Sequence, residues 1–453
     1  MDQNHYDLLV LGAGSGNMMP FEEMPDWRVG IVEPDRFGGT CLNRGCIPSK
    51  MFVYTADLAE AARQATDFGV QSSVGGIDWP AIRDRVFTRI DPIHERAVDH
   101  RRSTGVDVIQ APAQFVDVRT VEVGGQRLTA DRILVATGSR PVVPSIPGLD
   151  GVAFHTSDTI MRLESFPSSL LVIGGGFIAS EMSHVFGALG SEVTIVGRSD
   201  RLLPTHDDEI SRAFTRRYQE RFEVLLNSEV SYIEPGGVGC IATVDTPAGS
   251  RSVSAEVVLV ATGRRPNTDL LDVEAGGMTL DDHGHVVTDA GYLTTAENTW
   301  AIGDATNHFQ LKHMANAETR IAIHNITQPG DAKTAAFGPA PSAVFADPQV
   351  ATIGATEQQL EAEGVEYLSS TRHYQTTAYG WALEDTTSFA KLLADPHTRM
   401  VLGAHIIGPQ AATLLQPLVQ AMALGNTVDQ LARDVIYIHP ALTEVVENAL
   451  LDL

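Results

Sequence analysis

The sequence has few cysteines, few lysines and no long apolar segment, and each shortage excludes a class of protein. Three cysteines in 453 residues cannot build the dense disulfide framework of a small secreted fold. No apolar run approaches the roughly 18 residues that cross a bilayer. Only four lysines are present, and the net charge of -25 comes without a basic stripe, which argues against nucleic-acid binding. Since the N-terminal segment lacks the basic region of a secretion signal, we expect a cytoplasmic protein without membrane contact.

An internal repeat is the most informative pattern in the chain. Residues 7–15 (DLLVLGAGS) recur as residues 169–177 (SLLVIGGGF), and residues 132–141 recur as residues 257–266, each with Ala-Thr-Gly after an apolar run. Continuous apolar runs followed by glycines are typical of strands buried on both faces of a parallel sheet. The repeat therefore predicts an α/β fold with two doubly wound, Rossmann-like dinucleotide-binding domains.

Prolines and glycines near residues 144–151 interrupt this pattern and mark a domain boundary. The C-terminal part reads as a separate α+β domain, because it mixes strand and helix patterns after the repeat has ended. In it we expect strands at residues 350–352 and 400–407 and a helix at 411–424. The predicted division is a first dinucleotide-binding domain at 1–150, a second at 151–267, a strand-rich return segment at 268–336 and the α+β domain at 337–453.

The first glycine-rich loop has the pattern of a dinucleotide site. Gly12, Gly14 and Gly16 directly follow an apolar strand, so backbone N–H groups at a helix N-terminus could approach a pyrophosphate. Asn17 stands in place of the third glycine of the motif, which predicts looser packing of that helix. Glu33 follows the next strand, where a carboxylate accepts hydrogen bonds from an unphosphorylated ribose; the alternative is an exposed acid at a strand end. The loop thus predicts FAD or NAD.

The second loop differs at the position of that acid. Gly174, Gly176 and the small residue Ala179 complete its motif, but the following strand ends in Gly-Arg-Ser-Asp-Arg without a carboxylate at the strand end itself. Arg198 and Arg201 can pair with a 2′-phosphate, although arginines are more often plain surface residues. This pattern favours NADPH over NADH.

Cys41 and Cys46 lie in the segment GGTCLNRGCIPSK. A regular helix would hold residues five apart too far from each other for a disulfide, so the pair requires an irregular turn. Pro48 fits the first turn of a helix, which would place Cys46 at or near a helix N-terminus, with Arg44 and Lys50 close by. A reactive thiolate is favoured there over an inert core pair. No partner set with zinc spacing accompanies the pair, so no metal site is expected, and Cys240 reads as an incidental thiol.

His439 is the one histidine followed directly by proline and, five residues on, by a carboxylate, Glu444. The pair lies at the start of an apparent helix at 442–451. A carboxylate that orients an imidazole makes it an effective base and acid for thiol chemistry.

These segments together resemble the pyridine nucleotide-disulfide oxidoreductases of the glutathione reductase and dihydrolipoamide dehydrogenase type. Besides the loops and the cysteine segment, the resemblance includes residues 299–304 (TWAIGD), residues 345–348 with Gly354, and the His439 segment. It implies a homodimer with FAD at the first loop and NADPH at the second. Cys46 would face the flavin, Cys41 would attack a small disulfide, and His439 would reach the partner's disulfide, so that dimerisation is part of the mechanism.

The resemblance also implies an ion pair between Lys50 and Glu181 beside the reactive edge of the flavin. Both residues would contact cofactor. Further implied contacts are Ser15, Gly39, Thr40, Ala113, Gly138, Asp304, Leu311, His313 and Ala315 for the flavin nucleotide, and Gly175, Ile178 and Gly263 for the nicotinamide nucleotide.

Only the resemblance to known families limits the choice of substrate. The chain shows no second cysteine pair of the kind found in mercuric reductases, and it has two active-site cysteines where coenzyme A disulfide reductases use one. Residues 50–54, 155–161, 379–385 and 439–448 are similar to the mycothione reductases of actinobacteria, which implies mycothione as the substrate. Glutathione disulfide, bis-γ-glutamylcystine and lipoamide stay open, as does a flavoprotein that acts as a binding or redox-signalling partner.

Overall fold

Apolar segments of the first repeat form the centre of a sheet in the computed structural model, which describes residues 4–21 and 24–453. Its parallel part has the order β3-β2-β1-β6, with β17 beside β6, and an antiparallel extension β5-β4 continues from β6. The strands are β1 (His5–Leu11), β2 (Val29–Val32), β3 (Asp107–Ile109), β4 (Ala113–Asp117), β5 (Thr120–Val123), β6 (Gln126–Val135) and β17 (Thr299–Ala301).

The second repeat forms a separate sheet in which every pairing is parallel. Its order is β11-β10-β9-β15-β8. The strands are β8 (Phe154–His155), β9 (Ser169–Ile173), β10 (Glu192–Val196), β11 (Glu223–Leu225) and β15 (Val257–Val260), and the helices α4 (Phe177–Leu189) and α5 (Asp208–Arg221) follow β9 and β10. The two parallel sheets confirm the predicted fold class.

Two small antiparallel sheets accompany the repeats. One consists of β12 (Glu229–Gly236), β13 (Gly239–Thr246) and β14 (Gly249–Ala255). In the other, β7 (Ser139–Pro141) pairs with β16 (Arg264–Pro266), so the segments that follow the two Ala-Thr-Gly motifs bond to each other. This pairing connects the two dinucleotide units at their closing strands.

The C-terminal part contains the expected strands and helix in an antiparallel sheet of order β18-β19-β22-β21-β20. The predictions for residues 350–352, 400–407 and 411–424 are confirmed by β19, β22 and α10, and that for 442–451 by α12. The elements are β18 (Ser342–Val344), β19 (Val350–Gly354), α8 (Glu357–Glu363), β20 (Leu368–His373), α9 (Ala378–Ala382), β21 (Phe389–Ala394), β22 (Val401–Ile407), α10 (Ala411–Leu424), α11 (Val428–Arg433) and α12 (Thr443–Leu451).

The return segment differs from the prediction. Its only strand within residues 268–336, all of which the structure describes, is β17. The segment also forms α6 (Thr268–Leu271) and the longer helix α7 (Lys312–Thr327). The prediction of a strand-rich segment is therefore wrong, because turns and isolated bridges take up the residues between α6 and β17. The four-part division of the chain stays a prediction.

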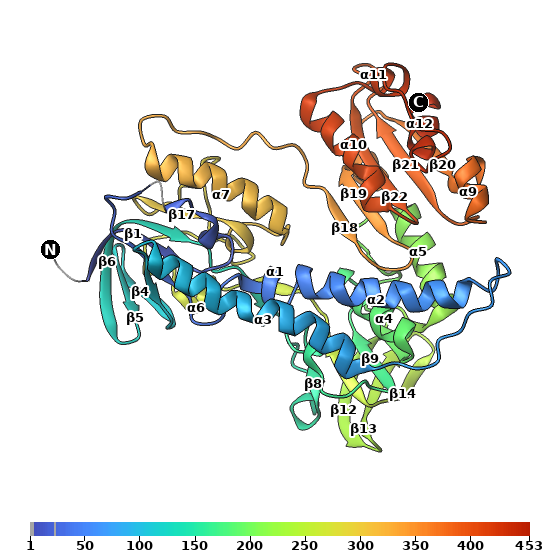
Figure 1. The fold of residues 1–453 in the computed structure, drawn as a ribbon, viewed down its shortest axis with the longest axis horizontal. Coiled ribbons are helices and arrows are strands. Elements are labelled where there is room, and N and C mark those ends of the chain that lie inside the picture. The colour runs from blue at the N-terminus through green and yellow to red at the C-terminus, as the bar shows by residue number, and fades with distance from the viewer. Residues whose placement is uncertain (1–3, 22–23) are drawn as a thin grey trace.

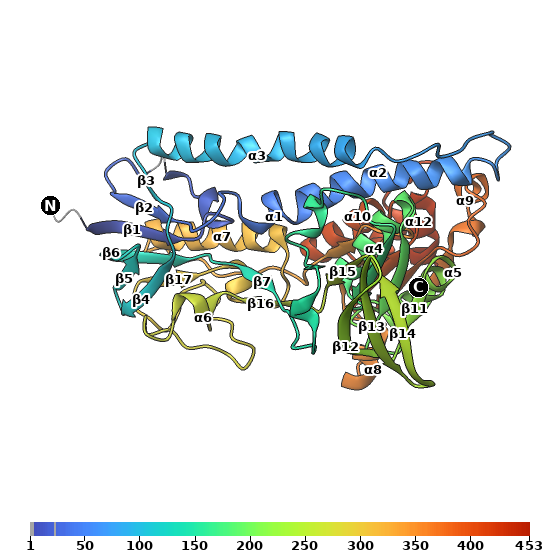
Figure 2. The same cartoon turned by 90° about the horizontal axis from the view of Figure 1, so that it is seen from below.

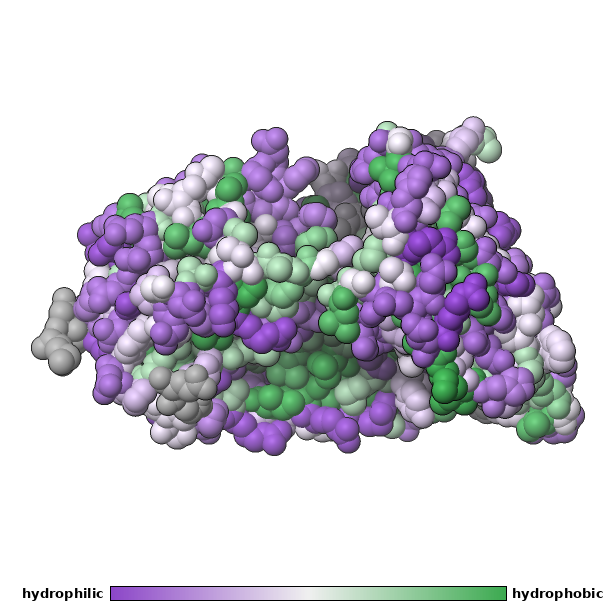
Figure 3. Space-filling view, turned by 90° about the horizontal axis from the view of Figure 1, so that it is seen from above, coloured by the Kyte–Doolittle hydropathy of each residue, from purple (hydrophilic) through white to green (hydrophobic). Residues whose placement is uncertain are grey.

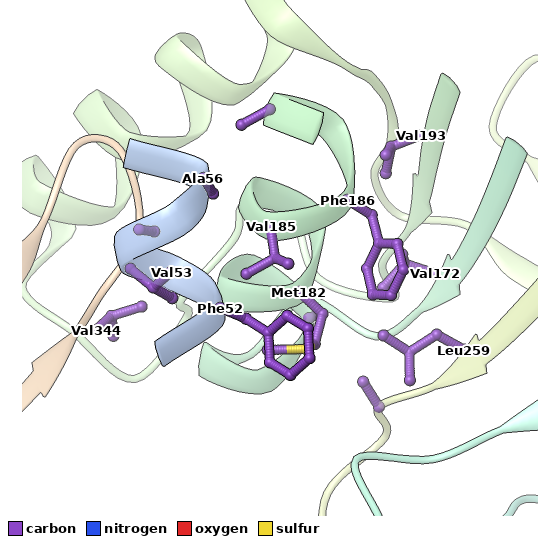
Figure 4. Close-up of a cluster of buried hydrophobic side chains, with 14 of the residues drawn as sticks. Phe52, Val53, Ala56, Val172, Met182, Val185, Phe186, Val193, Leu259 and Val344 are labelled. Carbon is purple, nitrogen blue, oxygen red and sulfur yellow. The ribbon is translucent and has the colours of Figure 1, made fainter. Parts of the chain in front are cut away.

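Three helices run from the cysteine segment along the molecule: α1 (Gly39–Asn43), α2 (Cys46–Gln64) and α3 (Trp79–Ser103). Figures 1 and 2 show α2 and α3 along the long axis, with the first sheet at one end and the second sheet and the C-terminal domain at the other. Apolar packing holds the N-terminal half of α2 in place. Figure 4 shows Phe52 and Val53 of α2 against Met182 and Val185 of α4, with Val344 of β18 on the opposite side.

Candidate active site

The cysteine pair lies at the junction of α1 and α2. Cys41 is in α1, and Cys46 is the first residue of α2, as predicted from Pro48. Gly45 joins the helices with φ -128° and ψ -118°, and a Cβ there would lie 2.9 Å from the carbonyl oxygen of Thr40. Cys46 is exposed and Cys41 is half-buried, and both are thiols in this structure. The irregular turn therefore holds the two sulfur atoms beside each other at a helix start.

The pKa values of the two thiols are shifted in opposite directions. The hydrogen bond that Cys41 donates lowers the pKa of Cys46 to about 7, and the Lys50 ammonium adds to this effect, while desolvation opposes it. The same hydrogen bond raises the pKa of Cys41, since loss of its proton would break the bond. Arg44, which the sequence placed among the activating cations, instead pairs with Asp35 and Asp158. Cys46 is thus the thiolate of the pair near neutral pH.

Lys50 and Glu181 form the expected ion pair. Lys50 Nζ lies 2.6 Å from both carboxylate oxygens of Glu181, which is 7% exposed. The backbone N–H of Phe345 also donates to Glu181, at 2.9 Å, and the Phe345 ring lies under the ammonium at 4.7 Å. α2, α4 and the C-terminal domain therefore meet at one charge pair beside the cysteines. Its role next to a flavin stays a prediction.

The first glycine loop needs its glycines for steric reasons. Gly12 has φ +107°, and a Cβ there would lie 2.3 Å from the carbonyl oxygen of Ala136. A Cβ on Gly39 would lie 2.8 Å from the Cα of Gly14, so the loop and the start of α1 touch through backbone alone. Because no side chain stands at this contact, the backbones of the loop and of the start of α1 can both be approached by a ligand.

The predicted helix after this loop is absent. Between Leu11 and Val29, no described residue is α-helical, and the loop continues as a three-residue 3₁₀ turn, η1 (Gly16–Met18). Pro20 and Pro25 explain the difference, because proline removes a helix N–H and clashes with the preceding turn. Asn17 therefore does not lie in an α-helix that follows the loop. Its side-chain and backbone oxygens instead accept hydrogen bonds from Arg101 of α3, at 2.8 and 2.6 Å.

Glu33 lies beside the same loop. Its carboxylate accepts hydrogen bonds from the backbone N–H groups of Ala13, at 2.8 Å, and Asp35, at 3.0 Å. Burial raises its pKa, against the effect of those two bonds. The carboxylate is thus fixed at the edge of the loop, with lone pairs left to accept from a ribose hydroxyl.

One cavity of about 1680 Å³ brings most of the predicted flavin-site residues together. It exceeds the roughly 300–1,000 Å³ of ordinary small-molecule pockets. Figure 3 shows a hollow between the two lobes with apolar side chains at its base. The predicted residues that line the cavity are Gly12, Gly14, Ser15, Glu33, Gly39, Thr40, Cys41, Cys46, Lys50, Ala113, Gly138, Ile178, Glu181, Asp304, Leu311, His313 and Ala315.

Polar groups in this cavity are arranged for a ligand. Ser139 donates to Asp304 at 2.6 Å and accepts from Arg264, at 2.9 Å, whose side chain is 6% exposed. Thr137 Oγ1 and Asn316 Oδ1 are buried without a hydrogen-bond partner among the described residues. Since buried polar atoms normally have partners, these two fit a polar molecule in the cavity. Arg264 was not among the predicted site residues, although it directly follows the second Ala-Thr-Gly motif of the repeat.

The second loop repeats the backbone geometry of the first outside this cavity. Gly174 has φ +132°, and its Cβ would lie 2.2 Å from the carbonyl oxygen of Ala261. Here an α-helix follows: α4 begins after Gly176 and buries Ala179. Arg198 is exposed and has no hydrogen bond or ion pair within the described part of the chain, whereas Arg201 pairs with Asp200 and Asp208. The cavity lining does not include Gly16, Gly174, Gly175, Gly176, Gly263, Arg198 or Arg201.

His439 also lies away from the cavity lining. Glu444 accepts a hydrogen bond from Nδ1 of His439 at 2.8 Å, which lowers the pKa of Glu444. The imidazole is 72% exposed while Glu444 is 19% exposed. The carboxylate therefore fixes the ring through Nδ1, while most of the imidazole stays exposed to solvent.

Two family models cover nearly the entire chain. The pyridine nucleotide-disulphide oxidoreductase model matches residues 6–319, and the dimerisation domain of the same family matches residues 340–450. The chain belongs to the pyridine nucleotide-disulphide oxidoreductase family. Membership in this family confirms the resemblance seen in the cysteine segment, and it makes the protein an oxidoreductase of disulfide chemistry.

Relatives within the family have different substrates. The chain is 41% identical to mycothione reductase of Mycobacterium tuberculosis over 99% of both chains. It is 34% identical to dihydrolipoyl dehydrogenase 2 of Haloarcula marismortui, over 98% and 95% of the two chains. Among solved structures, the flavoprotein disulfide reductase RclA of Escherichia coli superposes with a TM-score of 0.86 at 25% identity, over 98% and 99% of the chains.

FAD, the flavin that this family implies, fits the residues present. The glycine loop, Glu33 and Asp304 line one cavity with Lys50 and the cysteines, and they would hold the nucleotide and ribityl parts of the cofactor. None of the helices in the described part of the chain is long and apolar enough to cross a membrane.

Proposed function

We propose that the protein is an NADPH-dependent reductase of a low-molecular-weight disulfide, with mycothione as its substrate, acting in the cytoplasm as a homodimer. The observation that carries the proposal is the pair Cys41 and Cys46 at the junction of α1 and α2, in the cavity that the first glycine loop also lines. The relation to mycothione reductase supports the substrate. Exposed Arg198 at the second loop supports NADPH.

The residues divide the chemistry between them. The first glycine loop, Glu33 and Asp304 would hold FAD, which would supply the two-electron chemistry that links NADPH to the Cys41–Cys46 disulfide. The Cys41 thiol then attacks the substrate disulfide and displaces one thiol, and Cys46, as a thiolate, attacks the resulting mixed disulfide and releases the second. His439 takes the proton from Cys41 and returns it to the departing thiol.

The position of His439 supports the dimer as the working unit. Its ring is fixed by Glu444 and faces outward. The residues just before it, Val435, Ile436 and Ile438, are 47%, 95% and 74% exposed, which is unusual for large apolar side chains outside an interface. The dimerisation-domain match at residues 340–450 includes this segment. Each complete site would therefore combine the cysteines of one chain with the base of its partner.

The first test is an anaerobic titration of the purified protein with NADPH, followed by mycothione, glutathione disulfide and lipoamide in parallel. A long-wavelength thiolate–flavin band that forms at two electrons and is discharged fastest by mycothione supports the proposal. Absence of bound flavin, or of the band, contradicts the reductase mechanism. Discharge only by lipoamide or glutathione disulfide leaves the mechanism and overturns the substrate. Cys240→Ala is the control, because Cys240 is a buried thiol of the β12-β13-β14 sheet.

A mixed dimer tests the shared site. Neither Cys41→Ser nor His439→Gln should reduce substrate as a homodimer. Co-expressed, the two variants form heterodimers in which the intact cysteines of one subunit face the intact base of the other, so activity should return. If the heterodimer is as inactive as its parents, the base does not act across the interface.

A further inference from the structure

Lys312 is a partly buried cation without a carboxylate partner. Its Nζ donates to Ser15 Oγ at 3.0 Å and approaches Met18 Sδ at 3.3 Å. No carboxylate in the described part of the chain forms an ion pair with it. The other two lysines away from the surface are paired, Lys50 with Glu181 and Lys391 with Asp207, Glu209 and Glu357. The sulfur atoms of Cys41 and Cys46, when charged, act to raise the pKa of Lys312, but its ammonium has no carboxylate partner among the described residues. Since buried charges in proteins are normally paired, Lys312 is able to bind a further anion in the cavity that it lines.

The position of Lys312 in its helix points the same way. It is the first residue of α7, and the first turn of α7 contains no acidic residue. A positive charge at a helix N-terminus interacts unfavourably with the helix dipole. Burial also lowers the pKa of Lys312. Neither the helix nor the packing therefore favours a lysine here, and a function at the cavity accounts better for its presence.

The first loop lacks the group that usually attracts a phosphate. In a doubly wound domain the pyrophosphate lies at the N-terminus of the helix after the glycine loop, where the dipole supplies about half a positive charge. Here the described residues between Gly14 and β2 form 3₁₀ turns, including η1, and no α-helix. Lys312 Nζ reaches the same loop through Ser15, and Gly14, Ser15, Thr40 and Lys312 all line the one cavity.

We propose that Lys312 binds the diphosphate of FAD at the first glycine loop, in place of the helix N-terminus that this loop lacks. The proposal rests on the proposed flavoprotein function. An ammonium carries a full charge where a helix end carries about half, so a single lysine can replace the missing dipole. It comes from the return segment, far from the loop in sequence, and its hydrogen bond to Ser15 holds it at the loop before the cofactor binds.

The test is the affinity of the full-length protein for flavins. FAD release from the holoenzyme is measured by flavin fluorescence on dilution, at increasing KCl, for wild type, Lys312→Met, Lys312→Gln and Lys312→Arg. Losing a charged hydrogen bond should weaken FAD binding about tenfold to a hundredfold, and arginine should restore part of it. Wild-type affinity should also fall more steeply with salt than that of Lys312→Met. Lys333→Met, which removes an exposed lysine, is the matched control and should release FAD as wild type does.

Riboflavin separates a phosphate contact from other roles. It has the flavin ring without phosphates, so its binding to the protein freed of FAD should change less than about twofold in Lys312→Met and Lys312→Gln. Equal losses for FAD and riboflavin, or unchanged FAD release in both folded variants, would overturn the proposal. A wild-type protein that binds no FAD at all would contradict the proposed function itself. If instead wild type binds FAD and a Lys312 variant binds it equally well, only the role of Lys312 is contradicted.

Discussion

The two glycine loops begin alike and continue differently. In both, a glycine with positive φ packs its Cα against the carbonyl oxygen of an Ala-Thr-Gly segment, at Ala136 in the first loop and Ala261 in the second. The segments from there to the next strand have nearly the same length, but the first contains Pro20 and Pro25 and the second contains no proline. Among the described residues, only the second segment forms an α-helix. A nucleotide motif therefore fixes the turn, while the residues after it decide whether a helix dipole is available.

The threonines of the two Ala-Thr-Gly segments show the same division. Thr262 Oγ1 donates to the carbonyl oxygen of Val142 at 2.8 Å, a bond within the chain. Thr137, which lines the cavity, has a buried Oγ1 without a partner among the described residues. The two threonines, equivalent in the repeat, thus differ in whether the chain itself supplies a hydrogen-bond partner.

The largest effect is expected from adding a methyl group to either loop. Gly12→Ala and Gly174→Ala each force a Cβ to within about 2.3 Å of a carbonyl oxygen, at a backbone conformation that alanine disfavours. Gly12→Ala should be isolated without bound flavin, and Gly174→Ala should keep its flavin but not be reduced by NADPH. The flavin absorbance per protein and its bleaching by NADPH measure the two losses. A Cβ at Gly176 meets no protein atom, so Gly176→Ala is the control for folding. If both loop variants lose flavin, the loops do not bind separate nucleotides.

A core substitution tests how strongly the two units are joined. Phe52 of α2 is fully buried in the cluster that includes α4 of the second unit. Phe52→Ala should lower the free energy of unfolding by about 3–5 kcal/mol, through lost burial and the cavity left behind. Chemical denaturation followed by circular dichroism measures this change. Val238→Ala, at a side chain that is 89% exposed, should change stability by less than about 0.5 kcal/mol. A small effect of Phe52→Ala would mean that the units are coupled elsewhere.

A smaller effect is expected at the arginines of the second loop. Arg198→Ala should raise the KM for NADPH about tenfold to a hundredfold and leave that for NADH unchanged, because only NADPH carries the phosphate that the guanidinium would bind. Arg201→Ala should change the KM for NADPH less than about threefold, since two aspartates already hold that side chain. Steady-state kinetics with NADPH and with NADH measure these KM values. A larger effect at Arg201 than at Arg198 would reverse this assignment.

The smallest expected effect is a shift in the titration of Cys46. In the reduced enzyme, the thiolate–flavin band should be present above a pH of about 7 and disappear below it, because protonation removes the thiolate. The hydrogen bond from Cys41 is the main cause of this low pKa, so Cys41→Ala should move the loss of the band to higher pH, toward the ordinary thiol value of about 8.5. Cys41→Ser keeps a donor and should titrate closer to wild type. A lower midpoint in Cys41→Ala than in Cys41→Ser would contradict this account.

Much of the site followed from local sequence. The segment around Cys41 and Cys46 predicted the helix start at Cys46, because Pro48 and Gly45 act through short-range backbone geometry. His439 and Glu444, five residues apart, met as expected for the same reason. The helix after the first loop was predicted wrongly, since the glycine motif was given more weight than Pro20 and Pro25. The strand-rich reading of residues 268–336 failed because its apolar residues pack in turns and in α7.

The sequence by itself determined the repeated strand–glycine units, the thiol pair and the helix that begins at Cys46, since these depend on residues close together in the chain. Only the tertiary structure decided which distant groups meet: Glu181 with Lys50, Arg264 with Ser139, and Lys312 with the first loop. It also showed Arg44 and Arg201 already paired with carboxylates. A charge acts on whatever lies within a few ångströms in space, and packing across the whole chain sets those neighbours.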